Sequence, residues 1–175
     1  NKKKALQHLT ADEIKNFIGT DKFNQMFSFT IVRNPYSKIV SEFSHFLHLS
    51  GPKYHGVESP LRVNDQIIDN FDDFLHHIDN IVTNKLYDQN VFFDHFKPQS
   101  EFTQDSNNDN LIDKIYKFEN LDEVKQMLKR NYPKDCSIFP HSQKRKKKNI
   151  KLSESQKEKI YNIYENDFKL FNYPK

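Results

Sequence analysis

The sequence is poor in residues that build disulfides, metal clusters and glycine-rich turns. It has one cysteine, three glycines and no tryptophan among 175 residues. A single cysteine, Cys136, cannot form an internal disulfide or a cysteine-based metal cluster, and no metal is expected. No apolar run approaches the ~20 residues that a membrane-spanning helix needs, so we expect no span within this chain. No signal peptide is seen, although the chain starts at Asn1 rather than Met. A reducing cytoplasm is therefore the default compartment.

Aromatic and charged residues are abundant instead, with 16 phenylalanines, 8 tyrosines and 29% charged side chains. The length and the aromatic content predict a single domain, residues 1–175, with a real hydrophobic core. The formal net charge is only +3, and no nucleic-acid recognition motif accompanies it, so a nucleic-acid partner is not expected. The largest basic cluster, Lys144 to Lys148, is either a solvated loop or a contact for phosphates.

The most informative stretch joins a strand to a helix. Residues 27–32 (FSFTIV) are a β-branched and aromatic run too short for a helix, which predicts a buried strand. Asn34 is a good N-cap and Pro35 suits the first helical turn, so a helix is expected to begin at once. Its apolar residues recur at helical spacing and predict a face that packs on the sheet: Ile39, Val40, Phe43, Phe46 and Leu47.

This junction is a reasonable anion site. The start of a helix offers unpaired N–H groups and a partial positive charge, and Arg33 adds a planar fork of donors that suits a phosphate. Ser37 and Ser41 are four residues apart and share a helix face, where both hydroxyls can reach one anion. The alternative is structural: Arg33 caps a neighbouring element and the serines are small packing residues.

The run from Ile31 to Ser41 (IVRNPYSKIVS) resembles the 3′-phosphate-binding segment of sulfotransferases that use 3′-phosphoadenosine-5′-phosphosulfate (PAPS). The resemblance is to the carbohydrate (Golgi-type) branch and its bacterial relatives. Three later segments are similar to the same family in the same order, namely His95-Phe-Lys-Pro-Gln99, Phe118-Glu-Asn-Leu121 and the ending from Tyr164 to Tyr173. The resemblance implies an α/β domain of the P-loop nucleotide-binding type, rich in helix around a small parallel sheet.

The resemblance also implies a function. PAPS would be the co-substrate, with no metal, and a sulfuryl group would pass to a hydroxyl acceptor, a carbohydrate. Arg33 and Ser41 occupy the positions that hold the 3′-phosphate, and Ser37 is a further candidate. His8 occupies the place of a catalytic base, which suits a near-neutral imidazole. His95 either positions the acceptor or bonds a backbone carbonyl.

One expected element is missing. The family cradles the 5′-phosphosulfate in a glycine-rich loop after a first strand, and none of Gly19, Gly51 and Gly56 lies in such a setting. The chain is therefore expected to be the C-terminal portion of a longer domain, from the Golgi lumen if it is a piece of a eukaryotic type II membrane enzyme. The alternative is a degenerate, non-catalytic module that binds a nucleotide or an acidic polymer through Lys144 to Lys148. In the family, a basic loop at this place, after a segment like Pro140-His141-Ser142, closes over the nucleotide.

Overall fold

The computed structural model describes residues 8–48, 53–54, 57–59, 61–63, 66–132 and 150–175. Cys136, the segment Pro140 to Ser142 and the basic run Lys144 to Lys148 lie outside the described residues. The predictions that concern these residues therefore stay predictions.

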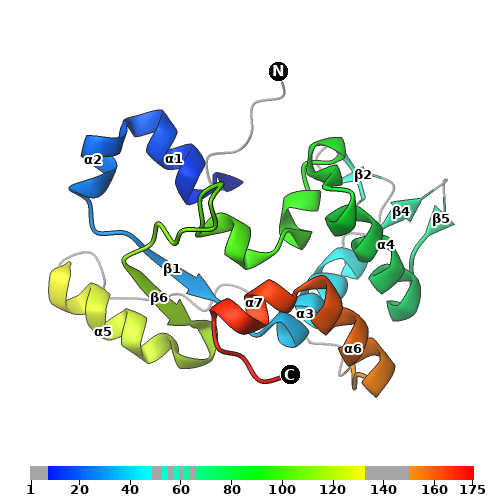
Figure 1. Cartoon of the computed structure of the whole chain (residues 1–175). Helices are drawn as coiled ribbons and strands as arrows, with labels where there is room; N and C mark the ends of the chain where they lie inside the picture. The colour runs from blue at the N-terminus through cyan, green and yellow to red at the C-terminus, as the bar shows by residue number, and fades with distance from the viewer. Residues whose placement is uncertain (1–7, 49–52, 55–56, 60, 64–65, 133–149) are drawn as a thin grey trace.

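The described chain is mainly helical, with short strands between the helices (Figure 1). The α-helices are α1 (Ala11–Ile18), α2 (Thr20–Asn24), α3 (Pro35–His48), α4 (Phe71–Thr83), α5 (Leu121–Asn131), α6 (Glu154–Ile163) and α7 (Glu165–Leu170). The strands are β1 (Phe29–Val32), β2 (Lys53–Tyr54), β3 (Val57–Glu58), β4 (Arg62–Val63), β5 (Gln66–Ile67) and β6 (Lys114–Lys117). Short 3-10 helices are η2 (Leu86–Gln89), η3 (Phe93–Phe96), η4 (Gln99–Phe102) and η5 (Phe118–Asn120).

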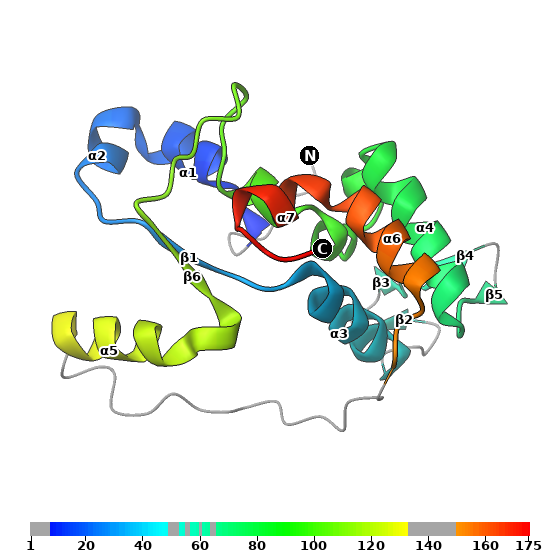
Figure 2. The same cartoon turned by 60° about the horizontal axis from the view of Figure 1, so that its bottom comes forward.

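The small parallel sheet that the sequence predicts is confirmed. Strands β1 and β6 pair in parallel, with Phe29 opposite Lys114 and Val32 opposite Lys117. In both views α1 and α2 lie on one side of this pair and α5 lies on the other (Figure 2). The remaining strands form two antiparallel pairs, β2 with β3 and β4 with β5. The strand ends before Arg33 and the helix begins at Pro35, as the sequence predicts. The strand begins at Phe29 rather than at residue 27, and the prediction that it is buried is wrong, because Val32 alone of its four residues is buried.

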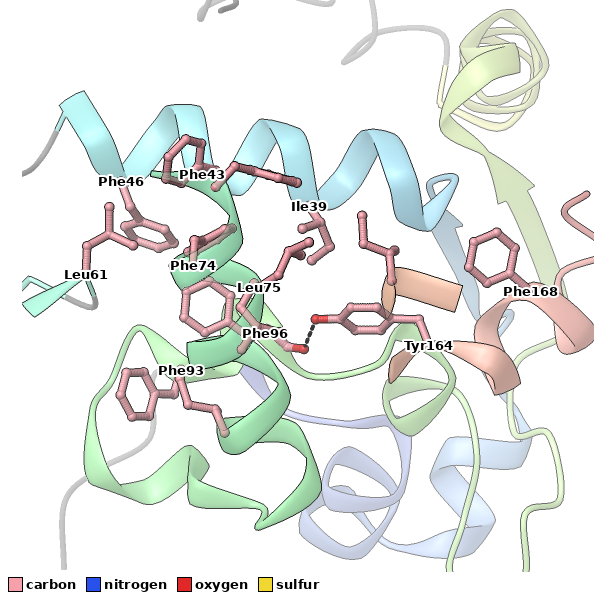
Figure 3. Packing of buried hydrophobic residues seen from close by; sticks show 14 residues of the cluster. Ile39, Phe43, Phe46, Leu61, Phe74, Leu75, Phe93, Phe96, Tyr164 and Phe168 are labelled. Atoms are coloured by element: carbon pink, nitrogen blue, oxygen red, sulfur yellow. Dashed lines mark hydrogen bonds between the residues drawn. The ribbon is translucent and has the colours of Figure 1, made fainter. Parts of the chain in front are cut away.

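The main hydrophobic cluster lies among helices (Figure 3). The apolar face of α3 packs against α4, α6 and η3, so the expectation that this face lies on the sheet is wrong. A two-stranded sheet of four-residue strands offers too little surface to cover a helix of this length, whereas α4 presents an apolar stripe along its whole length. The buried members of the cluster are Ile39, Phe43, Phe46, Leu61, Phe71, Phe74, Leu75, Ile78, Ile81, Phe93, Phe96, Ile160, Tyr164 and Phe168.

The sheet is partly uncovered. Phe29 and Ile31 of β1 keep 37% and 38% of their surface exposed. They line a groove of about 360 Å³ together with Leu9 and Ile14 from the α1 side and Phe102 of η4. Within the described residues β1 pairs only with β6, so its second edge carries no strand there.

A buried hydrogen bond inside the helical cluster gives a direct test of this fold. The hydroxyl of Tyr164 donates to the backbone oxygen of Phe96 at 2.8 Å (Figure 3), and Tyr164 is 1% exposed. Tyr164→Phe leaves that carbonyl without its donor, so we expect the free energy of unfolding to fall by about 1–3 kcal/mol in urea denaturation. Tyr132→Phe is the matched control, because Tyr132 is 55% exposed; equal stability losses in the two variants would contradict the packing described here.

Candidate functional site

The turn between β1 and α3 places Arg33 and Asn34 between the last strand residue and the first helical residue. The side-chain oxygen of Asn34 accepts hydrogen bonds from the backbone N–H groups of Tyr36 (2.9 Å) and Ser37 (3.4 Å). The predicted N-cap is confirmed, with a consequence for the site. Pro35 has no N–H, so the cap uses the first N–H groups of the helix, which the sequence argument had left for an anion. Side chains and the helix dipole remain as the attraction for a negative charge.

The guanidinium of Arg33 is held on two sides. Its Nε donates to the hydroxyl oxygen of Ser37 at 2.9 Å, and its carbon lies 4.8 Å from the ring centroid of Phe118. Ser37 in turn donates to the backbone oxygen of Asn34 at 3.1 Å. In the part of the chain that the structure describes, the terminal guanidinium nitrogens make no hydrogen bond. Burial lowers the pKa of Arg33, and the carboxylates of Glu119 and Glu42 oppose that shift.

Ser41 lies on α3 one turn beyond Ser37 and is half-buried. Its hydroxyl makes no hydrogen bond with any described residue. The structure thus brings Arg33 and Ser37 into contact, and it leaves Ser41 on the same helix face without a hydrogen bond to either of them.

Gln99 holds the backbone of Arg33 from the other side of the turn. Its side-chain oxygen accepts from the N–H of Arg33, and its side-chain nitrogen donates to the carbonyl of Arg33, both at 2.8 Å. Asp167, which is fully buried, accepts from the backbone N–H groups of Gln99 and Ser100, also at 2.8 Å. Gln99 is the last residue of the His95-to-Gln99 segment, and Asp167 belongs to the C-terminal segment.

Glu119, from the Phe118-to-Leu121 segment, also bonds to the turn between β1 and α3. Its carboxylate accepts from the N–H of Asn34 at 2.9 Å and from the hydroxyl of Tyr173 at 2.8 Å. Burial raises the pKa of Glu119, but the hydrogen bonds from Asn34 and Tyr173 and the charge of Arg33 together bring it below its usual value. The four segments that carry the family resemblance therefore converge on one strand-to-helix turn.

The two histidines of the sequence prediction also meet. The ring centroids of His8 and His95 lie 5.4 Å apart in an edge-to-face arrangement. Nδ1 of His8 is 3.6 Å from a carboxylate oxygen of Asp94, and Nδ1 of His95 is 3.4 Å from Oε2 of Glu42. The side chain of His95 is 32% exposed and that of His8 is 18% exposed, so His95 is the more accessible ring.

Lys38 connects the two parts of the site. Its ammonium donates to the backbone oxygen of His95 at 2.6 Å and lies 5.4 Å from the ring centroid of Tyr164. Burial lowers the pKa of Lys38, while the carboxylates of Glu42 and Asp167 act in the opposite direction. One helix, α3, therefore begins at the Arg33 turn and reaches His95 one turn later.

Sequence reasoning missed the roles of Gln99, Glu119 and Asp167, although all three lie in segments that it singled out. It also missed Lys38 and Glu42, whose spacing of four residues places them on one face of the predicted helix. The spacing of Lys38 and Glu42 indicates that they share a helix face, but no nearby residue indicates that His95 lies against that face.

Two general features of the described residues complete the site. They contain no group of three histidine, cysteine, aspartate or glutamate side chains that could hold a metal ion. None of the helices that the structure describes is long and apolar enough to cross a membrane.

The comparison with protein families agrees with this geometry. The model described as "Sulfotransferase family" matches residues 2–174, which is nearly the whole chain. This chain belongs to the sulfotransferase family, whose members transfer a sulfuryl group. No curated protein and no solved structure matches it.

The carboxylate of Glu119 makes the stability of the turn depend on pH. Its pKa in the folded protein lies below the usual value of 4.5. The ionised Glu119 carboxylate therefore stabilises the folded protein fully at pH values above its usual pKa. This stabilisation is lost as the pH falls through the lower pKa that Glu119 has in the folded protein. We expect Glu119→Gln to lower stability at neutral pH and to flatten the decline of unfolding free energy between about pH 5 and pH 3, measured by urea denaturation. Glu158→Gln, which removes a surface carboxylate 3.1 Å from Lys175, is the control; the same flattening there would contradict the assignment.

Proposed function

We propose that this chain binds the 3′-phosphate of PAPS and takes part in transfer of the sulfuryl group to a hydroxyl of a carbohydrate. The observation that carries the proposal is the fixed guanidinium of Arg33. Ser37 and Phe118 hold its orientation, while its terminal nitrogens make no hydrogen bond to a described residue. A planar fork of uncommitted donors at the start of a helix suits the geometry and charge of a phosphate.

The residues of the turn fit the 3′-phosphate end of the donor. Arg33 would bind the phosphate oxygens directly, and the hydroxyl of Ser41 would donate from the next turn of the same face. Ser37 would contribute at the same place, mainly by fixing the guanidinium, since its hydroxyl proton already goes to the backbone of Asn34.

The histidine pair supports the chemical part of the proposal. The donor supplies an activated sulfuryl group. His8 would accept the proton of the acceptor hydroxyl while the acceptor oxygen forms its bond to sulfur and the bond from sulfur to the bridging phosphate oxygen breaks. His95, whose ring is 5.4 Å away, would hold the acceptor in position through a neighbouring hydroxyl.

The first test uses adenosine 3′,5′-bisphosphate, the product left after sulfuryl transfer. In calorimetric titration we expect binding in the micromolar range to the wild-type chain. Arg33→Ala removes the bidentate donor, so its affinity should fall at least about tenfold. Arg130→Ala is the matched control, because Arg130 lies exposed in the last turn of α5. A well-folded wild type that binds nothing, or an Arg33→Ala variant with unchanged affinity, would contradict the proposed phosphate site.

The second test separates binding from chemistry. We expect His8→Asn to lower the rate of sulfuryl transfer from PAPS to saccharide acceptors by about 10²–10⁴-fold, with the affinity for adenosine 3′,5′-bisphosphate within about twofold of wild type. The reason is that the base acts on the acceptor and not on the 3′-phosphate. His76→Asn, at an exposed position of α4, is the control. A wild type that binds the nucleotide but transfers nothing would support a non-catalytic module instead.

A further inference from the structure

Helix α3 contacts His95 at two points that lie one helical turn apart. The ammonium of Lys38 donates to the backbone oxygen of His95 at 2.6 Å. Oε2 of Glu42 lies 3.4 Å from Nδ1 of the same residue. Lys38 and Glu42 are four positions apart and so face the same way. The helix that begins at the Arg33 turn therefore fixes both the backbone and the ring of His95.

The charge of Glu42 determines which ring nitrogen of His95 carries the proton. Burial raises the pKa of Glu42, but hydrogen bonding from His95 and the positive charge of Lys38 outweigh it and leave the pKa below its usual value. An ionised carboxylate can only accept a hydrogen bond. The nitrogen that faces it, Nδ1, must therefore be the donor, and in the neutral ring Nε2 then carries the lone pair.

The Nε2 atom is available to a ligand. His95 is 32% exposed, and its Nε2 makes no hydrogen bond with any residue in the described ranges. The ring lies against those of Phe46 and His8, each with a centroid distance of 5.4 Å. The ring of His45 stacks at 6.3 Å. The aromatic neighbours limit rotation of the imidazole, so the position of Nε2 is determined by the carboxylate on one edge and the packed rings around it.

We propose that Glu42 is a positioning residue that holds His95 as the tautomer protonated at Nδ1, so that Nε2 accepts a hydrogen bond from a second hydroxyl of the carbohydrate acceptor, next to the hydroxyl that reacts. This inference rests on the proposed function, since it assigns the acceptor side of that site. It gives the histidine pair a division of roles: His95 orients the acceptor through the neighbouring hydroxyl, and His8 takes the proton of the hydroxyl that attacks sulfur. The same helix would thus align the acceptor with the phosphate that Arg33 binds.

A purely structural contact would tie η3 to α3 without any requirement on the tautomer. The two interpretations differ in what Glu42→Gln does. A glutamine side chain fills the same volume but can donate as well as accept, so it preserves the packing and removes the requirement that Nδ1 be protonated.

The decisive experiment records imidazole nitrogen shifts of the ¹⁵N-labelled full chain by nuclear magnetic resonance at a pH where the rings are neutral. We expect His95 of the wild type to show a protonated Nδ1 and an unprotonated Nε2, and Glu42→Gln to show a mixture of the two tautomers. Glu165→Gln, which removes an exposed carboxylate paired with Lys169 on α7, should leave the His95 signals unchanged. Urea denaturation of each variant verifies that it is folded.

The kinetic counterpart is sulfuryl transfer with a saccharide acceptor. Glu42→Gln should lower kcat/KM for the acceptor by about tenfold or more, the effect of one misdirected hydrogen bond, with affinity for adenosine 3′,5′-bisphosphate unchanged. Glu42→Asp, which keeps the carboxylate, should restore part of the loss. A wild-type His95 protonated at Nε2, or unchanged signals in Glu42→Gln, would overturn the inference even if the nucleotide binds. Failure of nucleotide binding with the expected tautomer would instead overturn the proposed function and with it the acceptor role.

Discussion

The site depends on one pair of hydrogen bonds, between the side-chain amide of Gln99 and the backbone of Arg33. Arg33 lies between a strand and a helix, so its backbone N–H and carbonyl have no hydrogen-bond partner in either element. The side-chain amide of Gln99 provides a partner for both groups. The buried carboxylate of Asp167 in turn accepts a hydrogen bond from the backbone N–H of Gln99 and so fixes the position of that residue. Two segments far apart in the chain thus set the direction in which the guanidinium leaves the turn.

Local signals account for much of what the sequence predicts correctly. The strand before Arg33, the helix from Pro35 and the cap at Asn34 each depend on residues within one or two turns, and all three are confirmed. Thr10 and Ser153 likewise begin capping boxes, each made by residues only three positions apart.

The remainder could not be predicted because it depends on pairs distant in sequence. Nothing near Glu119 indicates that its carboxylate meets the backbone of Asn34, 85 positions away, or that Lys38 and Glu42 face His95. The apolar face of α3 has the same periodicity whether it packs on a sheet or on helices, so periodicity alone could not choose the partner. The cap at Asn34 was predicted correctly, but the prediction that the first N–H groups of the helix bind an anion was wrong. Those N–H groups already donate to the side chain of Asn34.

The position of β1 and β6 also has a consequence for the order in which the molecule assembles. Ser28 and Asp113, which bond at the start of this pair, are 85 residues apart, and each strand has only four residues. Closing so long a loop costs conformational entropy, and the hydrogen bonds of a short parallel pair offset little of that cost. Contacts among α3, α4 and η3 span shorter separations and bury far more apolar surface, so a helical nucleus can form without the sheet. We therefore expect the strand pair beside the arginine turn to form late and to open early, whereas His95 packs against Phe46, a member of the helical cluster that forms first.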